Sequence, residues 1–168
     1  MPDRDDILKA KDETLAEAGR SAVEICLAVR PDDVVTVVTE EAGYPIAATM
    51  LSAVEKVGPQ TGAFALERLG RRPLSRFPNE ILAALEQSTV SILVVTPLAG
   101  ELRARLSLLE IVNRRSLRHA HLIAVSAGAF RAGMRADYHG VDKLQDRVLA
   151  AVGGASRVRV TSPAGTDL

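Results

Sequence analysis

Short, densely apolar segments alternate along the chain with longer segments in which apolar residues recur at helical spacing. These short segments predict strands at residues 34–39, 61–66, 90–96 and 121–126, and the polar–apolar alternation of residues 156–161 predicts a fifth. The longer segments predict helices, and they cover residues 6–29, 45–57, 80–86, 100–115, 129–135 and 141–152. Strands that alternate with helices favour a parallel sheet with right-handed crossovers.

This alternation predicts an α/β fold, a three-layer sandwich around a mostly parallel sheet of about five strands, flavodoxin-like or Rossmann-like. Residues 34–39 are rich in β-branched side chains without strict alternation, which is typical of a strand buried on both faces. We assign residues 1–160 to this domain and residues 161–168 to the start of a truncated connection to a missing domain.

The C-terminal residues carry the pattern of an incomplete hairpin. Ser156–Thr161 alternates polar and apolar residues, and Ser162–Gly165 has the Pro and Gly of a tight turn. Thr166–Leu168 is typical of the first residues of a returning strand. Because a hairpin with one short arm leaves backbone groups unpaired, we expect these residues to be the first part of a larger protein.

Composition limits the classes of function. The 168 residues suffice for one domain with a sizeable core, and 47% of them are apolar. Lys plus Arg equals Asp plus Glu at 21 each, so no basic excess favours nucleic acid or anionic lipid as a partner. No apolar stretch is long enough to span a membrane, and the charged N-terminus lacks a signal-peptide core. We therefore expect a cytoplasmic protein.

The single cysteine, Cys26, excludes an internal disulfide and a cysteine-based zinc cluster. It lies in an apolar run, residues 25–29, within a helix segment that is apolar nearly all round. Apolar surroundings raise the pKa of a thiol, so we expect a buried, inert side chain in a reducing compartment.

In a parallel α/β fold, ligands bind beyond the carboxyl ends of the strands. The loops that follow the predicted strands there are residues 39–41, 69–72, 96–98 and 126–128. The first predicted strand is followed by two acids instead of a glycine-rich loop, and these would repel a pyrophosphate. Nucleotide binding in the usual manner is therefore not expected.

The residues expected to line this crevice contact a ligand rather than catalyse a reaction; they are Thr39, Glu41, Thr96, Arg103 and Ser126. Glu40 and Glu41 are adjacent, so in a functional site one would face the crevice and the other the solvent, but a charged loop rim is the favoured interpretation. Arg103 and Arg105 fit either an anion site or an exposed helix face. Ser126 has no partnered base and is not a credible nucleophile.

Histidines offer the remaining candidate chemistry. His119 and His121 are two residues apart, so on a strand their side chains share a face. They suit a metal, but no third ligand is in view, and a polar edge at a strand entry is the favoured interpretation. His139, beside Asp137, is assigned to an N-cap region of the following helix.

Several segments, taken in order, resemble the N-terminal domain of the aminopeptidase T/aminopeptidase S family of metalloaminopeptidases, whose superfamily includes a dihydroxypyridine dioxygenase. The segments that carry the resemblance are Cys26–Val34, Thr39–Glu41 with Pro45–Ala47, Arg72–Leu74 with Pro78 and Ile81–Leu85, and Arg157–Leu168. The last segment is the strongest piece, because in that family it leads from the N-terminal domain into the metal-bearing domain.

The resemblance implies an inactive half of an enzyme. Family members remove N-terminal residues from peptides with two divalent metal ions held by Glu, His and Asp, and those ligands lie in the missing domain. None is carried over to this chain, so we expect no metal, no cofactor and no catalytic residue in it. The implied partner is a metal-bearing domain, a second polypeptide or a second copy of the chain.

The ligand-facing edge departs from the family pattern. Glu101-Leu102 stands before Arg103-Ala104-Arg105 where the family has His-Thr. Where the family has Met-Pro-Gly, this chain has either Ala124-Val125-Ser126 or a loop shifted toward Ala127-Gly128. Two alternatives therefore stay open. One is a self-contained binding or assembly module, a degenerate pseudoenzyme that recognises a partner or small ligand. The other is a free-standing enzyme with a new site near Glu41, Thr96 and Ser126.

Overall fold

The computed structural model describes residues 2–168, with side chains from Arg4 onward. The chain divides into two compact units, the first ending at Arg135 and the second comprising Ala136–Leu168. Each unit is described separately below.

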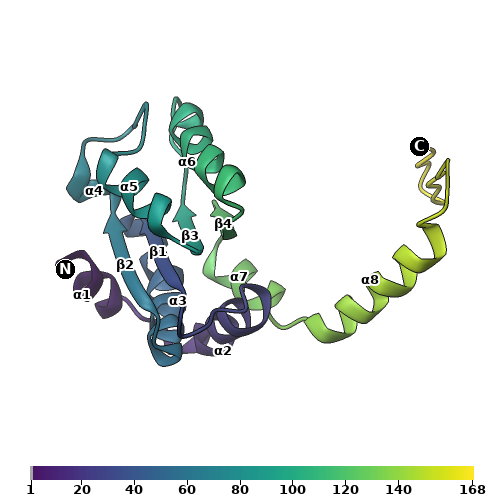
Figure 1. Cartoon of the computed structure of the whole chain (residues 1–168), viewed down its shortest axis with the longest axis horizontal. Coiled ribbons are helices and arrows are strands. Elements are labelled where there is room, and N and C mark those ends of the chain that lie inside the picture. The colour runs from purple at the N-terminus through teal and green to yellow at the C-terminus, as the bar shows by residue number, and fades with distance from the viewer. Residues whose placement is uncertain (1) are drawn as a thin grey trace. The chain divides into compact units, whose positions relative to one another are not determined.

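The first unit is built on one sheet of four parallel strands (Figure 1). These strands lie in the order β2-β1-β3-β4, and their bounds are β1 Val34–Thr39, β2 Gln60–Ala65, β3 Val90–Val95 and β4 Arg118–Ile123. The predicted α/β fold with a parallel sheet is confirmed. The predicted number of about five strands is wrong, because the sheet has four.

The segment predicted as a fifth strand forms a small closed turn within the second unit. Only an isolated antiparallel bridge joins Thr161 to Asp167, and Val160 exchanges two backbone hydrogen bonds of 3.0 Å with Leu168. Val158 and Val160 are exposed, at 62% and 52%. Alternation alone therefore did not produce a strand of the sheet.

Helices cover both faces of the sheet (Figure 1). On one face, Val35 and Val37 of β1 pack in a core with α2 (Ala16–Arg20), α3 (Tyr44–Val57) and α7 (Ala127–Gly133). On the other, Val38 packs in a core with α5 (Asn79–Gln87) and α6 (Leu102–Arg115). Every residue of β3 is buried, as expected for a parallel strand covered on both faces. Each fully buried aliphatic side chain stabilises the fold by about 1.5–3 kcal/mol.

The boundaries of α3 follow the sequence signals closely. Pro45 occupies the first turn, where its missing N–H costs no hydrogen bond. Gly58 ends the helix with φ of 90°, a left-handed conformation that glycine adopts without strain. At α5, Pro78 occupies the N-cap position without a side-chain hydrogen bond, and Asn79 is the first residue inside the helix.

The long helix predicted over residues 6–29 is interrupted. α1 spans Pro2–Lys9, and after a break a 3₁₀ turn (η1, Glu13–Leu15) leads into α2. The Asp12 side chain accepts a hydrogen bond of 2.9 Å from the Thr14 N–H, which caps the new start. A local side-chain cap thus competes successfully with a continuous helix.

A π-helix, η2 (Ser21–Cys26), follows α2 and changes which residues face the core. Ala22, Val23 and Leu27 are buried, whereas Cys26 is exposed. The prediction of a buried thiol is therefore wrong, because the wider helix turn shifts the inward-facing positions. Partial burial still raises the pKa of the Cys26 thiol above its usual value.

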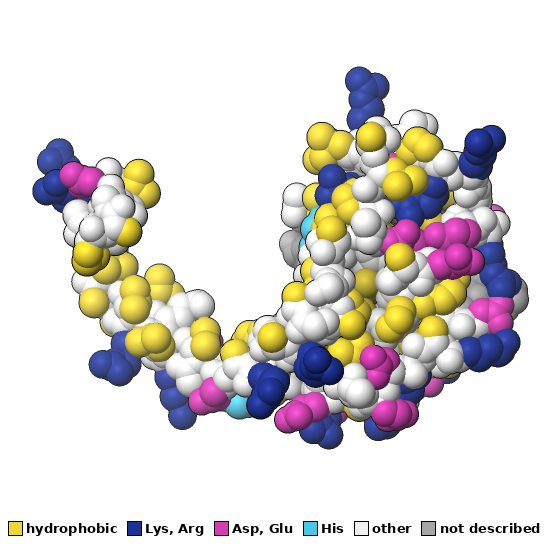
Figure 2. Space-filling model, turned by 180° about the vertical axis from the view of Figure 1, so that it is seen from behind, with side chains coloured by type: hydrophobic (Ala, Val, Ile, Leu, Met, Phe, Trp, Pro, Cys, Tyr) yellow, Lys and Arg dark blue, Asp and Glu magenta, His cyan; other side chains and the backbone are white. Residues whose placement is uncertain are grey.

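The second unit consists of α8 (Tyr138–Val152) and the turn described above. Asp137 caps α8, as predicted, by accepting a 3.0 Å hydrogen bond from the Gly140 N–H. Apolar side chains gather along α8 (Figure 2), and those that are 41–56% exposed, here called the α8 stripe, are Val141, Leu144, Val148, Leu149 and Val152. Among the described residues, no helix has both the length and the apolar character required to cross a bilayer.

Candidate functional site

Three loops meet at the carboxyl ends of β1 and β3, the edge at which the sequence predicts a ligand crevice. One follows β1 and carries Glu40, and one follows β3 and carries Thr96 and Glu101. The third follows α4 (Leu66–Leu69) and carries Arg72. These residues, Glu40, Arg72, Thr96 and Glu101, are in direct contact and are called the Arg72 cluster below.

Arg72 is the centre of this cluster. Its Nε donates to Glu101 Oε1 at 2.9 Å, and its Nη2 donates to Glu101 Oε2 at 2.6 Å, a two-point pairing of guanidinium and carboxylate. Nη2 also donates to the Thr96 carbonyl at 2.8 Å, and Nη1 donates to Glu40 Oε2. One side chain therefore joins the loops after β1 and β3.

The two carboxylates are bonded to backbone groups as well. Glu40 Oε1 accepts from the Thr96 N–H at 2.6 Å. Glu101 accepts from the Leu98 N–H at 2.8 Å and from the Leu74 N–H at 3.1 Å. Each of the four carboxylate oxygens thus has a donor, as buried charges require.

The cluster is buried, and Glu101 within it is held in its charged form. The side chains of Arg72, Glu40 and Glu101 are only 9%, 9% and 7% exposed. Hydrogen bonds from Arg72 lower the pKa of Glu101 to about 2, against the opposing effect of burial. The same contacts raise the pKa of Arg72. A carboxylate held this firmly in its charged form is a poor proton acceptor at neutral pH.

Little space remains beside the cluster. The hollow between Glu101 and the neighbouring apolar side chains measures about 10 Å³, and a single water needs roughly that much. Its apolar lining includes Leu66, Phe77 and Val95.

The structure places three of the predicted crevice residues around this cluster. Thr39 is fully buried, and its Oγ1 donates to the Val94 carbonyl at 3.0 Å. Thr96 belongs to the Arg72 cluster through its backbone carbonyl, and the residue itself is exposed. Glu41 is exposed, and Glu40 is the buried member of the acidic pair. Contact of these residues with a ligand stays a prediction.

The other two predicted residues lie on helices. Arg103 is exposed in the first turn of α6. Ser126 is the N-cap of α7, where its Oγ accepts a 3.1 Å hydrogen bond from the Ala129 N–H. Ser126 therefore has a local structural role.

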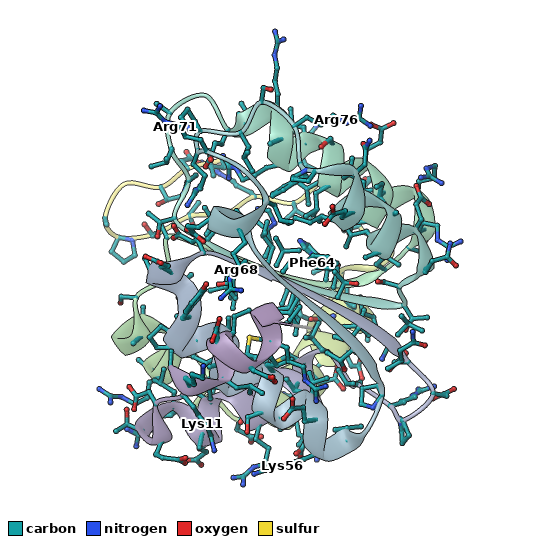
Figure 3. The ribbon with its side chains drawn as sticks, turned by 90° about the vertical axis from the view of Figure 1, so that its left-hand side faces the viewer. Lys11, Lys56, Phe64, Arg68, Arg71 and Arg76 are labelled. Atoms are coloured by element: carbon teal, nitrogen blue, oxygen red, sulfur yellow. The ribbon has the colours of Figure 1, made fainter. Side chains whose placement is uncertain are left out.

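The central residue, Arg72, was not among the sequence candidates. Its neighbours in the connection, Arg71 and Arg76, are exposed and lie at the outer side of the protein (Figure 3). Nothing in the local sequence distinguishes Arg72 from them, because its partners are 29 and 32 residues away. The signal that could have identified it is the coincidence of one Arg and two Glu in loops that end at the same edge of the sheet.

The histidine pair lies on β4, and the prediction of a shared face is confirmed. His119 Nε2 lies 3.0 Å from His121 Nδ1, and the ring centroids are 5.2 Å apart. Ser91 Oγ lies 2.7 Å from His119 Nδ1. Burial, with a contribution from His121, lowers the pKa of His119 to about 4. Burial and the charge of Arg105 lower the pKa of His121.

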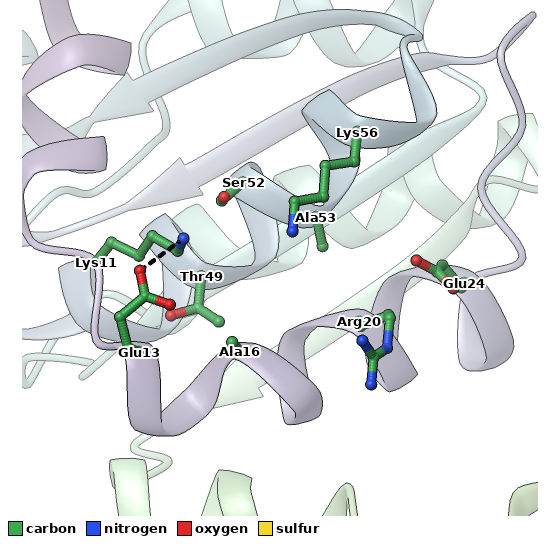
Figure 4. Close-up of a pocket in the computed structure, with 9 residues that line it drawn as sticks. All are labelled: Lys11, Glu13, Ala16, Arg20, Glu24, Thr49, Ser52, Ala53 and Lys56. Carbon is green, nitrogen blue, oxygen red and sulfur yellow. Dashed lines mark ion pairs between the residues drawn. The ribbon is translucent and has the colours of Figure 1, made fainter.

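A separate pocket of about 70 Å³ lies between α3 and the α2–η2 segment (Figure 4). Charged side chains on its rim include Arg20, Glu24 and Lys56, and Lys11 pairs with Glu13 at 2.9 Å. The mixture of both charge signs favours no single ligand class.

No protein-family model matches the chain, and a search of curated proteins finds no significant match. Within the described part of the chain, no three or more His, Cys, Asp or Glu side chains are grouped so that they could hold a metal ion.

Proposed function

We propose that this chain is the non-catalytic N-terminal half of an aminopeptidase-like metalloprotein, which packs against a metal-bearing domain or partner chain. The proposal starts from the sequence resemblance and is supported by two features of the structure. We further propose that the first unit is a flavodoxin-like three-layer sandwich. The strand order β2-β1-β3-β4, which matches the first four strands of the flavodoxin-like order, supports this.

The observation that carries the proposal is the α8 stripe. Five large apolar side chains lie on one helix and are 41–56% exposed. The second unit has only 33 residues, from Ala136 to Leu168, which is too few for a core of its own. A contiguous apolar stripe of this kind marks a surface that packs against another domain or chain.

The Arg72 cluster supports the non-catalytic assignment. At the edge where α/β enzymes bind their substrates, both carboxylates already have hydrogen-bond donors on each oxygen. The cluster holds the loops in place, and this suits a scaffold better than a reaction centre.

Hydrolysis is the first test. The purified chain, incubated with leucyl-p-nitroanilide and Zn²⁺, Co²⁺ or Mn²⁺, is expected to release no nitroaniline above the buffer rate, while a two-metal aminopeptidase in a parallel reaction does. Metal-dependent release that a chelator abolishes would overturn the proposal.

Exposure of the α8 stripe is the second test. The chain is expected to enhance the fluorescence of anilinonaphthalene sulfonate or to self-associate in light scattering, and the double substitution Leu144→Glu/Val148→Glu should reduce either signal. Lys143→Glu adds charge on the same helix without removing an apolar side chain and is the matched control. Equal signals from the double variant and the control would contradict an apolar docking surface.

A further inference from the structure

We infer that His119 and His121 form a two-imidazole chelating site for copper(II) on the edge strand β4. The inference goes beyond the proposed function, because the site is independent of the two-metal centre that belongs to another domain. It rests on the placement of the ring nitrogens, on the hydrogen bond that orients one ring, and on the position of the strand.

The distance between the two nitrogens suits chelation. With metal–nitrogen bonds of about 2.0–2.1 Å, nitrogens 3.0 Å apart subtend an angle of about 95° at a shared ion. This is close to the right angle between neighbouring ligands in a square plane, which copper(II) prefers, and is narrower than a tetrahedral angle. Two waters would complete the plane. The two nitrogens are hydrogen-bonded to each other in the metal-free protein, so an ion has to replace that hydrogen bond and both rings have to turn their lone pairs toward it.

Ser91 supplies the support that metal-bound histidines commonly have. Its Oγ lies 2.7 Å from His119 Nδ1, on the neighbouring strand β3, where Ser91 is paired in register with His119. In the tautomer that carries its proton on Nδ1, His119 donates to Ser91 and offers the lone pair of Nε2. His121, protonated on Nε2, then offers Nδ1. Binding therefore requires a change of tautomer but no net release of protons.

Access also favours the site. β4 lies at the edge of the sheet, next to β3 alone, and His121 is exposed while His119 is half-buried. Because His121 is exposed, an ion approaches from the His121 side and keeps water in its remaining coordination positions. Among the described residues no third protein ligand joins the pair, which limits the affinity but leaves positions open for water or an external ligand.

Arg105 of α6 opposes a cation here. Its charge acts on His121, and its Nε is buried without a hydrogen-bond partner in the described part of the chain. Removing this positive charge should strengthen binding, since like charges near a site repel. Copper(II) is also the first-row divalent ion that nitrogen ligands bind most tightly.

The test uses the tag-free full chain and copper(II) chloride, titrated by calorimetry and followed by electron paramagnetic resonance. We expect one ion per chain, with nitrogen hyperfine coupling from imidazole. His119→Ala and His121→Ala should each weaken binding by about tenfold or more, and Ser91→Ala by about tenfold through loss of ring orientation. Arg105→Gln should tighten binding.

His139→Ala is the matched control, because His139 is an exposed histidine on α8. It should bind copper(II) as the wild type does, and circular dichroism should show that every variant is folded. Absence of saturable binding, binding that survives the double substitution His119→Ala/His121→Ala, or loss of binding in His139→Ala would each overturn the site. Copper binding without peptide hydrolysis leaves the proposed function intact, so the two can fail separately.

Discussion

The Arg72 cluster and the α8 stripe place side chains in opposite environments. In the cluster, three charged side chains are no more than 9% exposed, and the charges and hydrogen-bonding groups satisfy one another. In the stripe, five apolar side chains are 41–56% exposed and have no comparable partners within their own unit.

The comparison shows that the first unit pairs its buried charges within itself, whereas the second unit leaves its apolar side chains exposed. Burial of charges is tolerated when their donors and acceptors are paired, and the cluster joins the loops through its own hydrogen bonds. Exposed apolar surface gains free energy from any partner that covers it. Substitutions that disturb the two regions should therefore have very different effects on stability.

The largest effect is expected from Arg72→Ala. The substitution leaves Glu40 and Glu101 buried without their counter-charge, which costs about 3–5 kcal/mol of unfolding free energy. Urea denaturation followed by circular dichroism measures this loss. Arg71→Ala, at the exposed neighbouring position, should change the unfolding free energy by less than about 0.5 kcal/mol. Similar losses in both variants would contradict a central role for Arg72.

A pH-dependent loss is expected from the same cluster. The folded-state pKa of Glu101 is about 2, below its ordinary value of 4.5. Its contribution to stability is therefore complete above pH 4.5 and disappears as the pH falls toward about 2. Denaturation at a series of pH values should show that wild type and Glu101→Gln differ most near neutrality and converge in acid. A difference that is constant with pH would exclude ionisation of Glu101 as the cause.

A smaller effect is expected at Gly43, where the loop after β1 approaches β3. A Cβ atom there would lie 2.6 Å from the Val94 carbonyl oxygen and 2.7 Å from Thr39 Oγ1. Gly43→Ala should cost about 1–3 kcal/mol by overpacking, measured as above. Gly128→Ala in α7 is the control, because its nearest neighbouring atom is 4.0 Å away. A neutral Gly43→Ala would show that the loop moves readily.

The smallest effect is expected from the α8 stripe. Leu144→Gln on the exposed face of α8 should change the unfolding free energy of the chain by less than about 0.5 kcal/mol. A loss comparable with that of Gly43→Ala, measured by the same urea titrations, would show that Leu144 is buried in solution and that the stripe is already covered.

Much of the fold could be predicted from the hydrophobic pattern of the sequence, at the elements whose pattern agrees with their place in the sheet and its helical layers. β1 has the predicted bounds, and α3 ends at residue 57, as predicted. β4 was predicted three residues too late, because its first residues, Arg118 and His119, are polar. They are nevertheless held in the strand by pairing with Val90 and Ser91 of β3.

The candidate site followed from the sequence only in part. The edge of the sheet and its acidic loop were predicted, but the choice between Glu40 and Glu41 depends on which carboxylate reaches Arg72. That contact joins residues 32 positions apart and has no local pattern. The exposure of Cys26 was predicted wrongly for a different reason. The expected burial assumed the period of an α-helix, and the π-helix in this segment has a different period.

The strand order also determines where backbone amides exchange with solvent most slowly. β1 and β3 each have a hydrogen-bonded strand on both sides, whereas β2 and β4 each have one. Deuterium uptake at interior strands requires the whole unit to open, while edge strands are labelled through local fluctuations. Val37 and Ile92 should therefore be among the last amides to incorporate deuterium, and their uptake would report the global stability of the first unit.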